Sequence, residues 1–169
     1  MDAADTRYAL EEYAIAKPKI IIGIDPGISG AIAMLIDNEL MIVSDMPVLK
    51  PGKKTIIDAR ELASLLDSDY DGNPVHVVIE NVASRPNQGV SSMFSLGHSA
   101  GMIEGVVAAL GYPYSMIAPA KWKRKAGLLG KDKEASRALA KRLYPDADLR
   151  YKKHHGRAEA ILIARYGVS

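Results

Sequence analysis

The chain has 169 residues, 48% of them hydrophobic and 25% charged, which is enough for one compact domain with a sizeable core and too few for two. It contains no cysteine, which excludes disulfides and thiolate zinc sites, and no apolar run approaches the ~18 residues that a membrane-spanning helix needs. The first seven residues lack the apolar core of a signal peptide. We therefore expect an intracellular protein that does not enter a membrane.

The net charge of +2 conceals an uneven distribution along the chain. Residues 121–157 contain 13 basic and 4 acidic side chains, a balance of +9, so that the rest of the chain carries −7. Taken alone, such a basic segment is often no more than a solvated helix surface. It is also typical of proteins that bind a polyanion such as nucleic acid.

Residues 1–18 are expected to form an extension, with a short helix at 5–17, and residues 19–169 one domain. The hydrophobic pattern predicts strands at 19–25, 31–36, 40–46, 75–80 and 112–117, and helices at 58–66, 91–110, 133–143 and 157–166. The first three strands would form an antiparallel meander. The first and fourth can then lie side by side and parallel. This predicts an α/β domain whose five-stranded mixed sheet, in the order 3-2-1-4-5, is flanked by helices.

Two acidic residues end neighbouring strands of this predicted sheet. Asp25 follows the first strand and Glu80 the fourth, where the order of the strands reverses and ligands tend to bind. Glu159 lies on the last helix. Partly desolvated carboxylates repel one another, and Mg²⁺, with its preference for hard oxygen ligands, relieves that repulsion. Taken singly, Asp25 would more often form a turn before Pro26, and Glu80 a helix cap or a salt bridge.

Six segments, taken in order, resemble the RuvC-type Holliday-junction resolvases of the RNase H-like superfamily, particularly their phage-encoded forms. The resemblance covers about residues 19–167. Its segments are Gly-Ile-Asp25-Pro-Gly, Val-Ile-Glu80-Asn, the small-residue helix at 95–105, Ala118-Pro-Ala-Lys121-Trp-Lys123, Gly130-Lys-Asp-Lys133 and the helix at 158–164 around Glu159. An Asp-x-Gly motif alone is weak, because actin-like ATPases share it.

The resemblance implies a homodimeric endonuclease that cleaves four-way and other branched DNA and leaves 5′-phosphate and 3′-hydroxyl ends. Its cofactor would be Mg²⁺, with Mn²⁺ as a substitute, and no nucleotide. Asp25, Glu80 and Glu159 would hold two metal ions, and Lys123 and Lys133 match the active-site lysines of the family. Its location would be the cytoplasm of a bacterial cell or of a phage-infected host.

The chain departs from the family pattern in two places. The family usually has a second acid, or a His, three residues before the last acid, where this chain has Gly156. His155, about one helical turn from Glu159, is the candidate for the fourth ligand and for a catalytic role. An aromatic that opens the junction in some members is absent from residues 81–83.

Polar and basic side chains around the acids are expected to contact DNA phosphates. They are Arg85, Asn87, Gln88, Lys121, Lys123, Arg124, Lys125, Lys131, Lys133, Arg137, Lys141, Arg142, Lys152, Lys153, His154 and Arg157. Trp122, which lies among these lysines, is equally compatible with core packing. The helix around Gly97 to Gly105 is the candidate dimer interface.

Three alternatives remain open. The chain could be an RNase H-like nucleic-acid-binding protein without resolvase activity, or an RNase H-like nuclease of another specificity. An actin-like phosphotransferase would also use Asp25-Pro-Gly, around a nucleotide phosphate. The chain lacks the second domain of that class and any Gly-x-x-x-x-Gly-Lys-[Ser/Thr] loop.

Overall fold

The computed structural model describes residues 19–68, 70–81 and 89–168. The predicted helix at 5–17 and the predicted DNA contacts Arg85, Asn87 and Gln88 lie outside these ranges. Within them, no helix is both long enough and apolar enough to cross a membrane.

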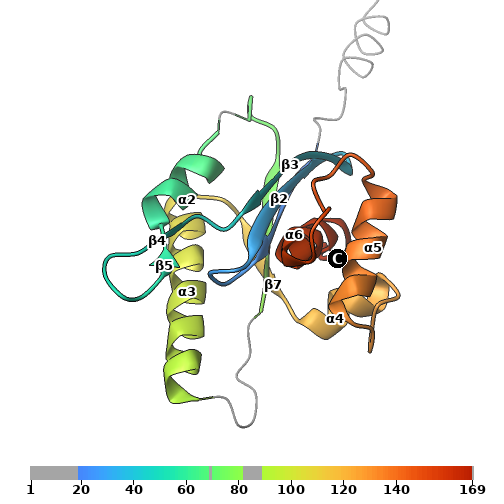
Figure 1. Cartoon of the computed structure of the whole chain (residues 1–169). Coiled ribbons are helices and arrows are strands. Elements are labelled where there is room, and N and C mark those ends of the chain that lie inside the picture. Colours follow the sequence, from blue (N-terminus) through green and yellow to red (C-terminus); the bar gives the residue numbers. More distant parts are fainter. Residues whose placement is uncertain (1–18, 69, 82–88, 169) are drawn as a thin grey trace, which may run out of the picture.

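A five-stranded mixed sheet forms the centre of the domain (Figure 1). Its strands are β1 (Ile20–Asp25), β2 (Ala31–Ile36), β3 (Glu39–Asp45), β6 (Val75–Glu80) and β7 (Tyr114–Ile117), in the order β3-β2-β1-β6-β7. β1, β2 and β3 pair antiparallel, whereas β1, β6 and β7 run parallel. The predicted order 3-2-1-4-5 is therefore confirmed, because β6 and β7 are the fourth and fifth strands of this sheet.

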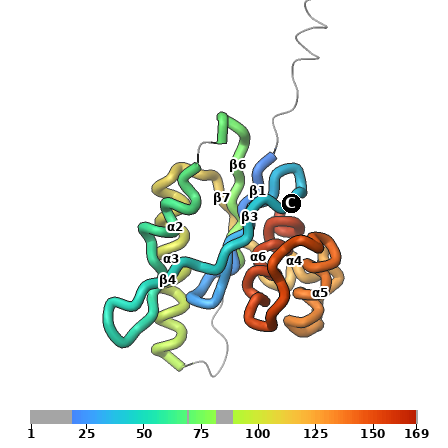
Figure 2. Tube along the Cα trace, turned by 45° about the horizontal axis from the view of Figure 1, so that its top comes forward, coloured from blue at the N-terminus to red at the C-terminus, as the bar shows by residue number. Residues whose placement is uncertain are grey.

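Helices cover both faces of the sheet (Figures 1 and 2). α2 (Ala59–Leu66) and α3 (Val90–Ala109) lie on one face, and α4 (Pro119–Lys125), α5 (Lys133–Leu143) and α6 (His155–Tyr166) lie on the other. The alternation of side chains along a strand divides the core between the faces. Thus Ile20, Ile22 and Ile24 of β1 pack with α2 and α3, while Ile21 packs with α6.

Several element ends follow from capping. Asp58 accepts hydrogen bonds from the backbone N–H groups of Arg60 and Glu61, both at 3.1 Å, and Asp132 accepts one from Ala135 at 2.9 Å. These side chains satisfy donors that a helix start leaves unpaired. The predicted starts of α2 and α5 agree with the structure to within one residue.

Several short elements and the start of the last helix were not predicted as the structure has them. The short strands β4 (Val48–Leu49) and β5 (Ile56–Ile57) form a separate two-stranded sheet, and neither is long enough to show a strand period. α4, with Pro119 at its start, was missed, and α6 begins at His155 rather than at Arg157. A 3₁₀ turn, Lys152–His154, runs directly into α6, so no turn or capping residue in the sequence marks where α6 begins.

The backbone of α6 lies directly against β1 at Gly23. A Cβ atom placed on Gly23 would lie 2.3 Å from the carbonyl oxygen of Ala160 and 2.4 Å from the nitrogen of Ala164, both closer than atoms can approach. These neighbours are backbone atoms, so a side chain could not displace them without moving the helix. Glycine at 23 therefore sets the distance between β1, which ends at Asp25, and α6, which carries Glu159.

We predict that Gly23→Ala lowers the free energy of unfolding by about 3 kcal/mol, at the upper end of overpacking costs, because α6 must shift away from the sheet. Gly89→Ala is the matched control, since a Cβ at Gly89 meets nothing within 4 Å and the residue has a negative φ of −62°. Urea unfolding of both variants measures the difference. Equal stability of the two variants would show that α6 does not need this close contact.

Candidate active site

Three carboxylates gather at the carboxyl edge of the sheet. Asp25 is the last residue of β1 and Glu80 the last residue of β6, and these strands are parallel neighbours with Ile24 opposite Ile79. Glu159 comes from the first half of α6, which packs across β1 and β2, and its side chain is buried. Two strands and one helix thus bring together acids that are 55 and 79 residues apart in the sequence.

The electrostatics of Asp25 reflect this grouping. Burial, and then the negative charges of Glu159 and Glu80, raise the pKa of Asp25 from its ordinary value of 3.8 to about 8. Lys133 and Lys123 act on the same carboxyl group in the opposite direction. The two other acids and the two lysines predicted as catalytic therefore lie within electrostatic reach of Asp25. A carboxyl group so destabilised in its charged form is typical of a site that takes up a cation.

The donor set fits a hard divalent cation, which prefers carboxylate oxygens. Glu159 Oε1 is buried and accepts no hydrogen bond, although Lys123 Nζ forms an ion pair with it at 3.1 Å. The ammonium group of Lys123 therefore compensates the charge of Glu159, but Oε1 still lacks a hydrogen-bond donor. In the part of the chain that the structure describes, no three His, Asp or Glu side chains are grouped closely enough to hold a metal ion. For Asp25, Glu80 and Glu159 to bind the same metal ion, their carboxyl groups would have to rotate toward one point.

Helix α4 contacts two of the carboxylates through adjacent residues. Trp122 is fully buried and its indole N–H donates to Glu80 Oε1 at 2.8 Å, while Lys123 forms the ion pair with Glu159. Lys123 Nζ also lies 5.1 Å from the centre of the Trp122 ring. Trp122 thus packs in the core, one of the two roles considered from the sequence. Its contact with Glu80 was missed, although a buried tryptophan needs an acceptor for its N–H.

The start of α6 explains the absence of a second acid before Glu159. A Cβ at Gly156 would lie 2.6 Å from the carbonyl oxygen of Ser29, in the loop that follows β1. This close approach leaves no room for a ligating side chain at position 156. His155, beside it, is half-buried and its Nδ1 lies 3.1 Å from the carbonyl oxygen of Lys152. Its role as fourth ligand stays a prediction.

Some residues predicted to contact DNA are engaged within the protein. The Arg157 guanidinium binds Asp45 at 2.6 and 2.9 Å and Asp148 at 2.9 Å, so it ties the end of β3 and a loop to α6. The two carboxylates raise the pKa of Arg157, and its hydrogen bond lowers the pKa of Asp45. The pKa of Asp148 is lowered first by the hydrogen bond from Arg150 and then by that from Arg157. His154 is only 3% exposed, so contact with DNA would require its side chain to leave the core.

Two further basic residues have protein partners. Arg137 binds Glu134 at 2.6 Å and the carbonyl oxygen of Leu149 at 2.8 Å, and Lys125 donates to the carbonyl oxygen of Val168 at 2.8 Å. Eight of the predicted DNA contacts have exposed side chains and neither an ion pair nor a side-chain hydrogen bond with the residues described here: Lys121, Arg124, Lys131, Lys133, Lys141, Arg142, Lys152 and Lys153. Their place in a DNA interface stays a prediction.

Comparison with known proteins gives matches in sequence and in structure, while no family model matches the chain. Over 122 residues, 69% of its length, the chain is 33% identical to the chloroplastic Holliday junction resolvase MOC1 of Chlamydomonas reinhardtii. It spans only 14% of that protein.

Two solved structures of Thermus thermophilus RuvC are similar to the chain. RuvC in complex with a Holliday junction substrate matches with a TM-score of 0.59 and 16% identity, over 86% of this chain and 90% of that one. A second RuvC structure matches with a TM-score of 0.51 and 16% identity, over 88% and 96%. The predicted resemblance to RuvC-type Holliday-junction resolvases is confirmed, and the chain has the RNase H-like fold of RuvC.

Proposed function

We propose that the chain is a structure-selective endonuclease that resolves Holliday junctions and other branched DNA by metal-dependent hydrolysis of phosphodiesters. The observation that carries the proposal is the group of Asp25, Glu80 and Glu159 at the carboxyl edge of the sheet, with Lys123 and Lys133 in electrostatic reach. The chain is similar to MOC1, which is named a Holliday junction resolvase, and to RuvC, which was solved in complex with a Holliday junction. Both similarities support the same substrate.

In this mechanism the three carboxylates would hold divalent metal, Mg²⁺ with Mn²⁺ as a substitute. When bound, the metal supplies Lewis-acid stabilisation of charge at the scissile phosphate. Trp122 holds one oxygen of Glu80 by its hydrogen bond, and Lys123, which pairs with Glu159, would contact a phosphate oxygen of the substrate. Lys133 offers a second cation for charge that develops in the transition state. The products would carry 5′-phosphate and 3′-hydroxyl ends, and His155 would add a ligand or orient water.

We also propose that the active form is a homodimer in the cytoplasm of a bacterial cell or phage-infected host. Paired cuts across a two-fold junction call for two sites related by a two-fold axis. Gly97, Gly101 and Gly105 recur every four residues on the exposed side of α3, and a Cβ at any of them would meet nothing within 4 Å. A second backbone could therefore approach α3 closely along this stripe.

One alternative function has an observation in its favour. As their side chains stand among the residues that the structure describes, the three carboxylates lie near one another but not closely enough to hold one metal ion. A protein that binds branched DNA without cutting it would not need them to hold a metal ion. Incubation of labelled linear, forked and four-way DNA with the protein and Mg²⁺ separates the two functions, because only a resolvase yields paired nicks in the four-way substrate.

We predict that Asp25→Asn, Glu80→Gln and Glu159→Gln each lower the single-turnover cleavage rate by roughly 10³-fold, since each removes a metal ligand. Binding to four-way DNA in Ca²⁺ should stay close to that of the unchanged protein. Glu61→Gln, which changes an exposed acid in the first turn of α2, serves as the matched control. Cleavage at the unchanged rate by any of the three variants would remove that residue from the site.

The raised pKa of Asp25 predicts how stability depends on pH without metal. The folded state retains the Asp25 proton up to about pH 8, whereas the unfolded chain loses it near pH 3.8. The folded state therefore binds more protons between these values, and its stability falls as the pH rises through them. Asp25→Asn should remove the decrease in stability that comes from Asp25. It should therefore raise the Tm at pH 8, by roughly 2–4 °C for each kcal/mol by which the free energy of unfolding increases.

Thermal unfolding in EDTA at pH 5 and pH 8 measures this effect. Added Mg²⁺ should raise the Tm of the unchanged protein at pH 8 and leave that of Asp25→Asn nearly constant. If Asp25→Asn were less stable at pH 8 than the unchanged protein in EDTA, the carboxyl group would be satisfied without a cation.

Trp122→Phe should keep an aromatic ring in the core, although a smaller one, and remove the donor to Glu80. Loss of a group that orients a metal ligand typically costs 10–100-fold in metal affinity or activity, so we expect a rise of roughly that size in the Mg²⁺ concentration needed for half-maximal rate. Tyr144→Phe is the control, because it removes the O–H that donates to the carbonyl oxygen of Asn38 at 2.9 Å, remote from the acids. Equal Mg²⁺ dependence of the two variants would leave Trp122 with a packing role alone.

A further inference from the structure

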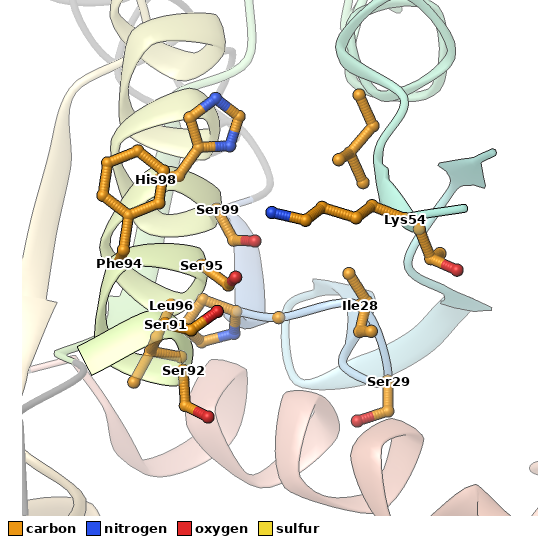
Figure 3. Close-up of a pocket in the computed structure, with 14 residues that line it drawn as sticks. Ile28, Ser29, Lys54, Ser91, Ser92, Phe94, Ser95, Leu96, His98 and Ser99 are labelled. Carbon is orange, nitrogen blue, oxygen red and sulfur yellow. The ribbon is translucent and has the colours of Figure 1, made fainter. Parts of the chain in front are cut away.

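A cleft of about 650 Å³ adjoins the candidate active site (Figure 3). Residues 26–29, which directly follow Asp25, line one part of it. The first half of α3 forms one wall, and residues 54–56, at the start of β5, form the opposite wall. Its volume lies within the range of sites that bind small ligands. None of the functions assigned to residues above uses this cleft.

The cleft offers hydroxyl groups and one cation. Ser91, Ser95 and Ser99 recur every four residues along α3, so they lie on the same side of the helix and all line the cleft. Lys54 extends from the opposite wall toward α3, on the side of Ser99 (Figure 3). No Asp or Glu is among the residues described as lining it. This chemistry favours an anion that accepts hydrogen bonds, as a phosphate diester does.

The rim of the cleft offers an exposed aromatic surface. Phe94 is 72% exposed, and its ring is stacked on that of His98 with centroids 6.2 Å apart and planes 18° apart. Ile28, in the loop after β1, is 51% exposed. Exposed large apolar side chains that surround a polar cleft often mark a binding site. An aromatic pair on one wall of a cleft and a cation on the other can together bind an unpaired nucleotide, by stacking on the base and contact with the backbone.

The position of the cleft identifies which nucleotide would enter it. Because residues 26–29 continue directly from Asp25, a strand whose scissile phosphate lies at Asp25 can extend its neighbouring nucleotide along this loop. Strands change partners at the centre of a branched DNA, so nucleotides there can leave the stack at lower cost than in a duplex. We infer that the cleft binds one unpaired nucleotide of the cleaved strand, with its phosphate at Lys54 and its base on Phe94. This inference rests on the proposed function and specifies how that site engages its substrate.

Site-specific cross-linking tests the placement directly. The chain has no cysteine, so Ser95→Cys introduces a single thiol into the cleft. Four-way DNA with a thiol-tethered base at successive positions, bound in Ca²⁺, should form disulfides only at nucleotides adjacent to the branch point. Ser64→Cys, an exposed serine of α2 outside the cleft, is the control. Cross-links spread evenly along the arms, or no stronger than those of Ser64→Cys, would overturn the inference.

Two neighbouring lysines provide a matched test of the phosphate contact. Lys54 lines the cleft and Lys53, next to it, does not, although both are exposed. Lys54→Ala should weaken binding of four-way DNA several-fold and flatten the slope of log affinity against log salt by about 0.7–0.9, the value of one phosphate contact. Lys53→Ala should change both by clearly less. Equal losses for the two variants would place both lysines in a general electrostatic field and overturn the specific contact.

Phe94 could instead be covered by a second copy of the chain, because it lies on the exposed side of α3. Phe94→Leu should reduce the fluorescence increase of 2-aminopurine at the branch point and leave the sedimentation coefficient unchanged. Val90→Ala, another exposed apolar residue of α3 that does not line the cleft, should alter neither. A monomeric Phe94→Leu protein that still gives the full fluorescence increase would assign Phe94 to a dimer contact and overturn its stacking role.

These outcomes are separate from failure of the proposed function. If four-way DNA is cleaved through the three carboxylates but Ser95→Cys gives no localised cross-link, the resolvase function stands and the nucleotide site fails. If no branched DNA is cleaved while the cross-link remains localised at the branch point, the site stands and the cleavage function fails.

Discussion

The close contact between α6 and β1 is the constraint on which the rest of the site depends. At Gly23 the helix backbone rests on the strand with no side chain between them, and at Gly156 the start of the same helix rests on the loop after the strand. Together these contacts fix α6 in both position and rotation over the sheet. Glu159 can therefore be buried beside Asp25 rather than pointing to solvent.

Such a group of one buried and two partly buried carboxylates opposes folding, and the structure offsets the cost with nearby donors. Trp122 gives a hydrogen bond to Glu80, and Lys123 places a positive charge against Glu159. Both residues come from α4, a seven-residue helix whose position depends on the buried Trp122 ring. The side chain that anchors α4 in the core thus also orients an acid at the sheet edge. Stability and the arrangement of the site are coupled through one residue.

The sequence predicted most of the sheet because its strands are strongly apolar and end in turns or acids. The continuous burial of β1 follows from its central place, and its partners follow from the lengths of the connections. α4 was missed because seven residues, four of them basic, show no hydrophobic period. The partners of Arg157 could not be predicted either, since Asp45 is 112 residues away and only the folded chain brings the two together.

In the candidate site, too, the sequence predicted which residues lie together but not how their side chains contact one another. Residue type and position at strand ends predicted that Asp25 and Glu80 would lie together, because parallel neighbouring strands end at the same edge. The orientation of their carboxyl groups, the hydrogen bond from Trp122 and the ion pair of Lys123 depend on side-chain packing. No spacing rule in the sequence encodes those contacts. The cleft beside residues 26–29 was missed for a related reason, since its walls come from three separate segments.

The fit of Gly156 against Ser29 limits the mutational routes open to this site. A single base change could convert a glycine codon to one for aspartate or glutamate, yet the new side chain would meet the backbone of the loop after β1. An acid at this position would need a compensating change in the loop, which also carries the wall of the cleft. The number of ligands that α6 can supply at position 156 is therefore linked to the loop that lines the cleft.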